Sequence, residues 1–297
     1  MRDHFAAAII AECNKPDHFF LTGDLGFMAL EGVRDAFGSR FINIGVAEQN
    51  MIGVAAGLAR EGNTVFAYSI APFCYARPFE QIRNDICLSG LPVCVVGNGG
   101  GYGYGHMGPT HHALEDCAAM ASLGMAVYAP AFNEDLAPLL GAISGPSYLR
   151  LGLDARPTDT AVATYRPWRQ VLEGERGALL ALGPLAGVAW DALRELDAGV
   201  RPAVWAVTEP SFTSLPAEVC GQLASGPLYV VEEHVREGGL GMCAALALVQ
   251  QQVPTRRFVH RYALRYPSGR FGSQAFHRRQ SGLDANSIRS MVLDCTE

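Results

Sequence analysis

The stretch RFINIGVAEQNMIGVAAGLAREGNTVFAYSI, residues 40–70, decides the fold class. It begins and ends with short apolar runs, at 40–45 and 64–70, which are typical of strands buried on both faces of a sheet. Between them lies an alanine-rich segment with helical spacing that ends near Gly62, as helices often do. Strand, helix and strand in this order predict parallel strands joined by a helical crossover.

The same alternation extends through the first half of the chain. The segment 78–90 has helical spacing and predicts another helix. Further apolar runs predict buried strands at 18–24, 91–97, 125–130 and 147–151. Repeated alternation of this kind predicts a parallel sheet covered by helices on both faces.

A polar, proline-bearing stretch at 154–170 has neither the strand nor the helix period and is predicted to be a linker. A second α/β unit follows it. Its strands are predicted at 177–183, 201–207, 227–233 and 256–262, and its helices at 187–196, 238–251 and 283–293. The predicted fold class is therefore α/β, with two doubly wound domains at residues 1–157 and 170–297.

Composition narrows the classes of function. The 297 residues are 49% hydrophobic and 18% charged, with a net charge of −6, which predicts a globular chain. Without runs of Lys and Arg, nucleic acid and anionic membranes are not expected as partners. Eight scattered cysteines without a CxxC pair indicate buried thiols, and the lack of a long apolar stretch or leader predicts a cytoplasmic protein.

Ligands of open α/β sheets bind beyond the carboxyl ends of the strands, so the residues that follow each apolar run are the candidates. These are Asp24, Glu48, the loop around Phe73, and the segment 97–112. Glu48 lies near the start of an almost uncharged helix, and a carboxyl group in apolar surroundings has a raised pKa and can hold a proton near neutral pH. The alternative is an acid that simply favours the helix macrodipole.

The glycine-rich run GNGGGYGYGHMGPTHHALED, residues 97–116, contains a formal GxGxxG pattern at Gly103, Gly105 and Gly108. A dinucleotide fingerprint opens a helix directly, whereas Pro109 and two histidines precede the helix predicted at 114–121. We interpret the glycines as allowing the backbone to approach a ligand closely, with a mobile surface loop as the alternative. No carboxylate or cysteine completes a metal-binding spacing with the histidines, so His111 is predicted to be a polar group at the ligand.

Several blocks together resemble the C-terminal portion of the transketolase family, which are thiamine diphosphate enzymes. The matching blocks are GDLG (23–26), RFINIGVAEQNMIGVAAGLA (40–59), FEQIRND (79–85), MGPTHHALED (107–116) and VEEHVREGGLG (231–241). They cover nearly the whole chain. The resemblance implies a thiamine diphosphate pyrimidine-binding domain followed by a transketolase C-terminal domain.

The resemblance also implies roles for individual residues. Glu48 corresponds to the catalytic glutamate that protonates or hydrogen-bonds N1′ of the cofactor's aminopyrimidine, a role that suits a desolvated carboxyl group. Asp24 and Leu25 correspond to residues that line the cofactor. His111 corresponds to the catalytic, substrate-facing residue of the GPTH motif. Aromatic stacking on the pyrimidine is assigned to Phe73 first and Tyr75 second, with core packing as the competing explanation, and Arg77 is expected to face the same pocket.

Family members of full length bind the diphosphate and Mg²⁺ through a GDG motif and a later asparagine, and this sequence has no GDG. The resemblance therefore implies a split enzyme, in which a separate diphosphate-binding subunit ligates Mg²⁺ and the active species is an α2β2-type assembly. The alternative is a homodimer that has lost catalysis. Glu232, Glu233 and His234 correspond to residues of subunit contact and pocket shape, with helix capping and surface solvation equally open.

The substrate residues depart from those of sugar-phosphate transketolases. Arg2 matches one phosphate-binding arginine, but Leu153 stands where a second is expected, Met28 where a serine assists it, and Met107 where an aspartate precedes GPTH. Losing a guanidinium removes a bidentate phosphate contact, so we expect a smaller, unphosphorylated or carrier-bound substrate. Arg150 is interpreted as a structural residue at a strand end.

Three functions stay open on this basis. The first is a subunit that transfers a two-carbon ketol unit between small molecules. The second is a subunit of a 2-oxoacid-type thiamine enzyme that passes an acyl or glycolyl group to a carrier. The third is a non-catalytic scaffold with the same fold.

Overall fold

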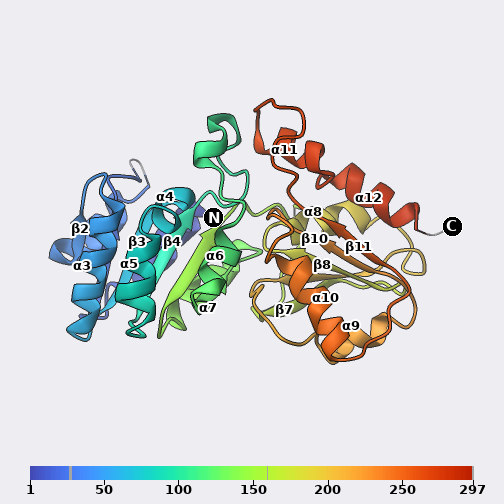
Figure 1. Ribbon diagram of the computed structural model, residues 1–297, viewed down its shortest axis with the longest axis horizontal. Helices are drawn as coiled ribbons and strands as arrows, with labels where there is room; N and C mark the ends of the chain where they lie inside the picture. Colours follow the sequence, from blue (N-terminus) through green and yellow to red (C-terminus); the bar gives the residue numbers. More distant parts are fainter. Residues whose placement is uncertain (27–28, 159, 296–297) are drawn as a thin grey trace.

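The computed structural model describes residues 1–26, 29–158 and 160–295. The first half forms a six-stranded sheet in the order β2-β1-β3-β4-β6-β5, in which all paired strands are parallel (Figure 1). Its strands are β1 (His18–Thr22), β2 (Phe41–Asn43), β3 (Thr64–Ile70), β4 (Val93–Asn98), β5 (Ala126–Tyr128) and β6 (Ser147–Leu151). Each apolar run predicted as a strand in this half is confirmed.

Helices cover both faces of this sheet. Alternate side chains of β3 show why: Val65 and Ala67 belong to the core on the α3 face, whereas Phe66 and Tyr68 belong to the core on the α1 face. The helices are α1 (Arg2–Glu12), α2 (Glu31–Phe37), α3 (Glu48–Arg60), α4 (Ala71–Tyr75), α5 (Phe79–Gln81), which continues as a π-helix (Ile82–Cys87), α6 (Asp116–Ser122) and α7 (Leu136–Gly141). Short 3₁₀ turns lie at Gly38–Arg40, Gly105–Met107, Pro109–His111 and Asn133–Asp135.

The second half forms a five-stranded sheet in the order β11-β10-β8-β9-β7, beside the first in Figure 1. Its strands are β7 (Trp168–Leu172), β8 (Ala178–Leu182), β9 (Ala203–Val207), β10 (Leu228–Val231) and β11 (Phe258–Arg261). Its helices are α8 (Leu185–Leu193), α9 (Ala217–Gln222), α10 (Leu240–Gln250), α11 (Gln274–Ser281) and α12 (Ala285–Leu293). The predicted α/β fold class is confirmed in both halves.

The second sheet is not wholly parallel, because β7 pairs antiparallel with β9. Strand β7 begins at Trp168, so the last residues of the stretch 154–170 are not linker as predicted. The domain limits at 1–157 and 170–297 stay predictions.

The thiols and helix lengths bear on two further expectations. Cys74, Cys94 and Cys117 are buried, whereas the other five cysteines are half-buried, and all eight are free thiols. The prediction of buried thiols is therefore correct for three of them. Within the described part of the chain, no helix is long and apolar enough to cross a bilayer.

Candidate active site

Glu48 is the first residue of α3 and follows the loop that leaves β2. Its carboxylate is almost fully buried, with a relative exposure of 3%. Ser69 Oγ, at the end of β3, donates to Glu48 Oε1 over 3.4 Å, and Arg77 Nη1 donates to Oε2 over 2.8 Å. The expectation that Glu48 lies in apolar surroundings is therefore wrong at Oε2, which contacts an arginine 29 residues later in the chain.

Three other predicted site residues gather around Glu48. The guanidinium carbon of Arg77 lies 3.9 Å from the centre of the Phe73 ring, a cation–π contact. The Phe73 and His111 rings meet edge to face at 5.1 Å. Thr110 Oγ1 lies 2.9 Å from His111 Nδ1, within hydrogen-bond distance. The fold thus links Glu48, Arg77, Phe73 and His111 by successive contacts between three segments, the start of α3, residues 73–77 and the turn Pro109–His111.

An open depression of about 450 Å³ lies over the start of α3. Residues 46–50 and Arg77 line it. A buried carboxylate, an aromatic ring and an open depression fit a flat, nitrogen-bearing ring better than they fit a metal ion. Among residues 1–26, 29–158 and 160–295, no group of three or more His, Cys, Asp or Glu side chains is placed to hold a metal.

Asp24 and Leu25 lie next to this place but line another depression, of about 430 Å³, together with Asn43. Asp24 has a positive φ of 58°, and it exchanges two hydrogen bonds with Asn43: its N–H donates to Oδ1 over 3.0 Å, and its own Oδ1 accepts from Nδ2 over 2.9 Å. Gly23, one residue earlier, lies beside Glu48, since a Cβ there would be 3.6 Å from Glu48 Oε1. The assignment of Asp24 and Leu25 to the cofactor stays a prediction.

Tyr75 does not share the position of Phe73. It is buried in the core of the first sheet, where its ring lies edge to face with Tyr148 at 6.4 Å. Burial raises the pKa of Tyr75, as expected for a phenol without access to water. Core packing, the competing explanation for both aromatics, therefore applies to Tyr75, and Phe73 remains the candidate for stacking.

The predicted substrate residues are placed separately. Arg2 begins α1 and pairs with its neighbour Asp3 over 3.3 Å. Met107 and Leu153 are exposed apolar side chains, with relative exposures of 58% and 60%. Met28 lies outside the described residues. The substrate roles of Arg2 and Met107 stay predictions.

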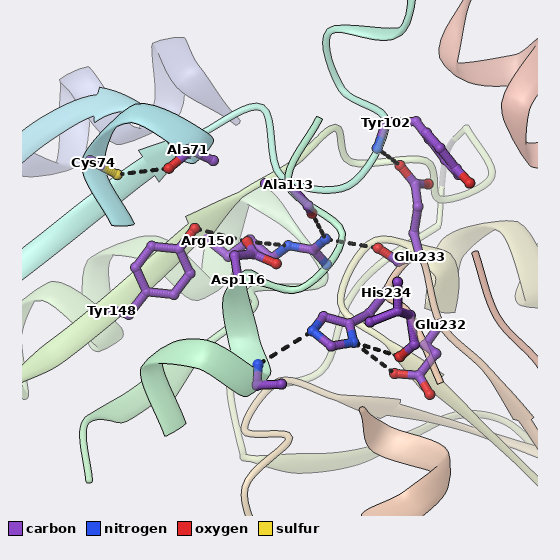
Figure 2. A network of polar contacts seen from close by, with 12 residues as sticks. Ala71, Cys74, Tyr102, Ala113, Asp116, Tyr148, Arg150, Glu232, Glu233 and His234 are labelled. Carbon is purple, nitrogen blue, oxygen red and sulfur yellow. Dashed lines mark hydrogen bonds and ion pairs between the residues drawn. The ribbon is translucent and has the colours of Figure 1, made fainter. Parts of the chain in front are cut away.

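Arg150 is a buried structural residue of β6, as we interpreted it (Figure 2). Its guanidinium donates to Asp116 Oδ2 over 2.9 Å, to the carbonyl oxygen of Ala113 over 2.9 Å, and to that of Glu233 over 2.8 Å. Burial opposes the charge of Arg150, but Asp116 together with Cys117, Tyr148 and Glu233 outweighs it, and the pKa of Arg150 is raised. Tyr148 also donates to Asp116 Oδ2, over 2.8 Å.

The Glu232-Glu233-His234 triplet follows β10 and is buried, so surface solvation is the wrong interpretation. Glu232 accepts from the backbone N–H groups of Leu240 and Gly241, over 2.7 and 3.0 Å, and therefore caps α10. Glu233 Oε1 accepts from the N–H of Tyr102 over 2.7 Å (Figure 2).

The same triplet joins the two sheets. His234 Nε2 accepts from the N–H of Ala118, in α6, over 3.3 Å. Glu233 also accepts from Gln274 Nε2 over 2.8 Å and forms an ion pair with Arg278, both in α11. Sequence reasoning missed Gln274 and Arg278, since no local signal connects them to a glutamate more than forty residues earlier.

The glycine-rich run makes close backbone contacts within the molecule. A Cβ at Gly105 would lie 2.5 Å from the carbonyl oxygen of Gly272, and a Cβ at Gly103 would meet the backbone of Gly99. The glycines at these two positions therefore let the run fold tightly on itself and approach the second half of the chain. A close approach of the run to a ligand stays a prediction. Figure 1 shows this run projecting beside α11.

Two other histidines stand in this contact as structural groups. The His277 ring stacks on Tyr102 at 4.7 Å and lies 5.0 Å from the ring of His112. His112 Nδ1 lies 2.9 Å from the hydroxyl of Tyr266, and its Nε2 lies 3.1 Å from the carbonyl oxygen of Gly105. Burial lowers the pKa of both histidines, so the neutral imidazoles are the forms that pack here.

Comparison with known proteins defines the class. Residues 1–152, just over half of the chain, match the family described as "Transketolase, pyrimidine binding domain". The chain belongs to the transketolase family, as the sequence blocks implied, and is a thiamine diphosphate-dependent transferase of the transketolase type.

Within that family, the chain is similar along most of its length to proteins named as transketolase subunits. It is 31% identical to a subunit of the apulose-4-phosphate transketolase of Actinobacillus succinogenes, over 86% of this chain and 85% of that protein. It is 30% identical to 6-deoxy-6-sulfo-D-fructose transketolase subunit SqwH of a Clostridium species, over 100% of this chain and 94% of that protein. A solved split-gene transketolase, described as an inactive β4 tetramer, superposes with a TM-score of 0.81 at 28% identity, covering 99% of this chain and 97% of that one.

Proposed function

We propose that this chain is the pyrimidine-binding subunit of a split transketolase, which transfers a two-carbon ketol unit between small molecules with a separate diphosphate-binding subunit. The observation that carries the proposal is the buried carboxylate of Glu48, which lines an open depression together with Arg77, the residue that packs on the Phe73 ring. The family membership and the names of the two relatives support it.

The residues at the start of α3 have the chemistry to hold the pyrimidine half of thiamine diphosphate. When bound, this cofactor supplies a carbanion centre that takes up the two-carbon unit. Glu48 would hold the proton shared with N1′ of the aminopyrimidine, and its burial would shield this hydrogen bond from water. Phe73 offers a flat apolar face for stacking, and His111, against its edge, faces the substrate.

We assign the Mg²⁺ ion and the diphosphate contacts to the partner subunit and expect an α2β2-type assembly in the cytoplasm. The two relatives are named as subunits, and the structural neighbour is a tetramer of a split-gene transketolase described as inactive. A chain of this kind that lacks catalytic activity alone is expected to gain it when the diphosphate-binding subunit is added.

The substrate is expected to differ from the standard sugar phosphates. Leu153 stands where an arginine binds phosphate in the family pattern, and Met107 stands where the family has an aspartate at the substrate. Both are exposed apolar side chains here. The names of the two relatives are consistent with this expectation, since one acts on apulose 4-phosphate and the other on a sulfonated fructose. The first of these keeps a phosphate group, so we base the proposal on an unusual sugar and not on the absence of phosphate.

The test is reconstitution. The diphosphate-binding subunit is identified by co-purification, thiamine diphosphate is titrated into the pair, and ketose donors are then offered with aldehyde acceptors. We expect cofactor uptake and ketol transfer only by the pair. Acylation of a carrier protein without ketose exchange would favour the 2-oxoacid-type enzyme, and no cofactor uptake by the pair would favour the scaffold.

A further inference from the structure

One guanidinium group occupies both of the contacts that the proposed function assigns to the cofactor ring. Arg77 donates to Glu48 Oε2 over 2.8 Å, the carboxylate expected to meet the aminopyrimidine. The same group lies 3.9 Å from the centre of the Phe73 ring, the surface expected to stack on it. A ring that bound Glu48 and Phe73 would have to displace Arg77 from both.

The guanidinium of Arg77 and the aminopyrimidine ring share the properties that favour binding between Glu48 and Phe73. A guanidinium is planar, carries its N–H donors in that plane, and stacks on aromatic faces. An aminopyrimidine is also planar, bears nitrogen atoms at its edge, and stacks on aromatic faces. A carboxylate at the edge of a flat group and a phenyl ring over its face therefore suit either of them.

We infer that Arg77 is a placeholder for the aminopyrimidine, that is, a positioning residue whose guanidinium occupies the place of the ring. It holds the Glu48 carboxylate in place until the cofactor binds and displaces the Arg77 side chain. The inference rests on the proposed function, since it supposes that the ring binds at Glu48. Its physical reason is the cost of a buried carboxylate without a partner, which Arg77 removes while the ring is absent.

The side chains of Glu48 and Arg77 differ in how freely they can move, and this difference determines which of them is displaced. Glu48 is 3% exposed and is held by Ser69 as well as by Arg77. The Arg77 side chain is 45% exposed and lies beyond the end of α4. A long side chain with its stem in water can swing into solvent, whereas Glu48 is fixed by the first turn of α3.

The first measurement is the affinity of the assembled pair for thiamine diphosphate, by calorimetry with saturating Mg²⁺. Arg77→Met removes the competitor, so its dissociation constant is expected to fall about fivefold, the ratio that corresponds to about 1 kcal/mol. Arg77→Lys keeps the charge but not the planar face, and an intermediate value is expected. Arg60→Met, at the far end of α3, is the matched control and is expected to leave the dissociation constant unchanged.

The second measurement uses the isolated chain and does not depend on the cofactor. Melting temperatures of Arg77→Met, Glu48→Gln and the double variant form a cycle in which the two losses are expected not to add, because they break one contact. Strict additivity would show that the ion pair is absent in solution and would overturn the inference.

The remaining outcomes separate the inference from the proposed function. Unchanged or weaker cofactor binding in Arg77→Met, with normal binding in the parent pair, would overturn the placeholder and leave the split transketolase intact. No binding by the parent pair or by any variant would refute the proposed function itself, and the placeholder with it.

Discussion

Arg150 of β6 donates a hydrogen bond to the backbone carbonyl oxygen of Glu233 over 2.8 Å, and this contact ties the first sheet to the segment that follows β10 in the second. The same guanidinium forms a buried ion pair with Asp116 over 2.9 Å. A single side chain therefore neutralises a buried carboxylate and connects the two halves of the molecule.

Arg150→Met is expected to lower the free energy of unfolding by about 3–5 kcal/mol, because it leaves Asp116 buried without its cation. Urea denaturation at neutral pH measures the loss. The control is Arg83→Met, whose parent side chain is exposed and donates to its neighbour Asn84 over 3.1 Å, and a change within about 0.5 kcal/mol is expected there. A loss below about 1 kcal/mol for Arg150→Met would show that the network is dispensable.

Gly105→Ala is expected to cost about 1–3 kcal/mol, because the new methyl group meets the backbone of Gly272 at 2.5 Å and neither backbone can yield without separating the halves. Gly57→Ala is the matched control. Gly57 is exposed on α3 with nothing within 4 Å of the added Cβ, so a gain of about 0.5–1 kcal/mol is expected. Thermal melting compares both variants, and equal stability of the two would contradict the proposed packing.

The buried histidines predict a loss of stability in acid. Burial lowers the pKa of His112 and of His277 below the value of 6.5 expected in the unfolded chain. Below about pH 6.5 the unfolded chain therefore binds protons that the folded chain does not, and the free energy of unfolding falls by up to about 1.4 kcal/mol per pH unit for each such proton. Above about pH 6.5 both forms are neutral and this term no longer changes with pH.

Urea denaturation at pH 7.5 and 5.5 measures this dependence, and His277→Gln isolates one histidine. We expect a smaller loss between the two pH values in His277→Gln than in the parent chain. His4→Gln removes an exposed histidine of α1 and is expected to keep the parent's dependence. Identical dependence in all three proteins would mean that His277 is protonated in the folded chain as easily as in the unfolded one.

The sequence predicts the central strands because both faces of the sheet are buried. Val65, Phe66, Ala67 and Tyr68 are all apolar, since each side of β3 meets its own layer of helices. Strand β7 is not a continuous apolar run, because its Arg169 is buried in an ion pair with Asp135 over 2.8 Å. A strand stabilised by polar partners far away in the sequence has no local signal.

The candidate site also contains residues that the sequence indicates and a contact that it does not. Glu48 stands out in the sequence as an acid at the start of an apolar helix, and Phe73 and His111 follow predicted strands. The contact between Glu48 and Arg77 could not be predicted, because 29 residues separate them and only the turn after β3 brings the arginine back to α3. The contacts of the glycine-rich run are hidden for a related reason: a close approach of backbone is visible in the sequence, but the segment that it approaches is not.

Glu48→Ala is expected to lower turnover by the reconstituted pair at least about 100-fold, the scale on which a positioned proton-transfer group acts. The fold is expected to survive, because the arginine released by the change is 45% exposed and can be solvated. Loss of a first-turn acid from α3 costs about 0.3–1 kcal/mol, which leaves the chain folded at room temperature.

Circular dichroism and thermal melting verify folding, and a single-turnover assay with saturating thiamine diphosphate measures the rate. Glu80→Ala removes an exposed acid from α5 and is the control that should keep full turnover. Because Glu48 is the one group to which the proposed function assigns the shared proton, turnover in Glu48→Ala within a few-fold of the parent would remove that assignment. The proton at N1′ would then have to be held by another group.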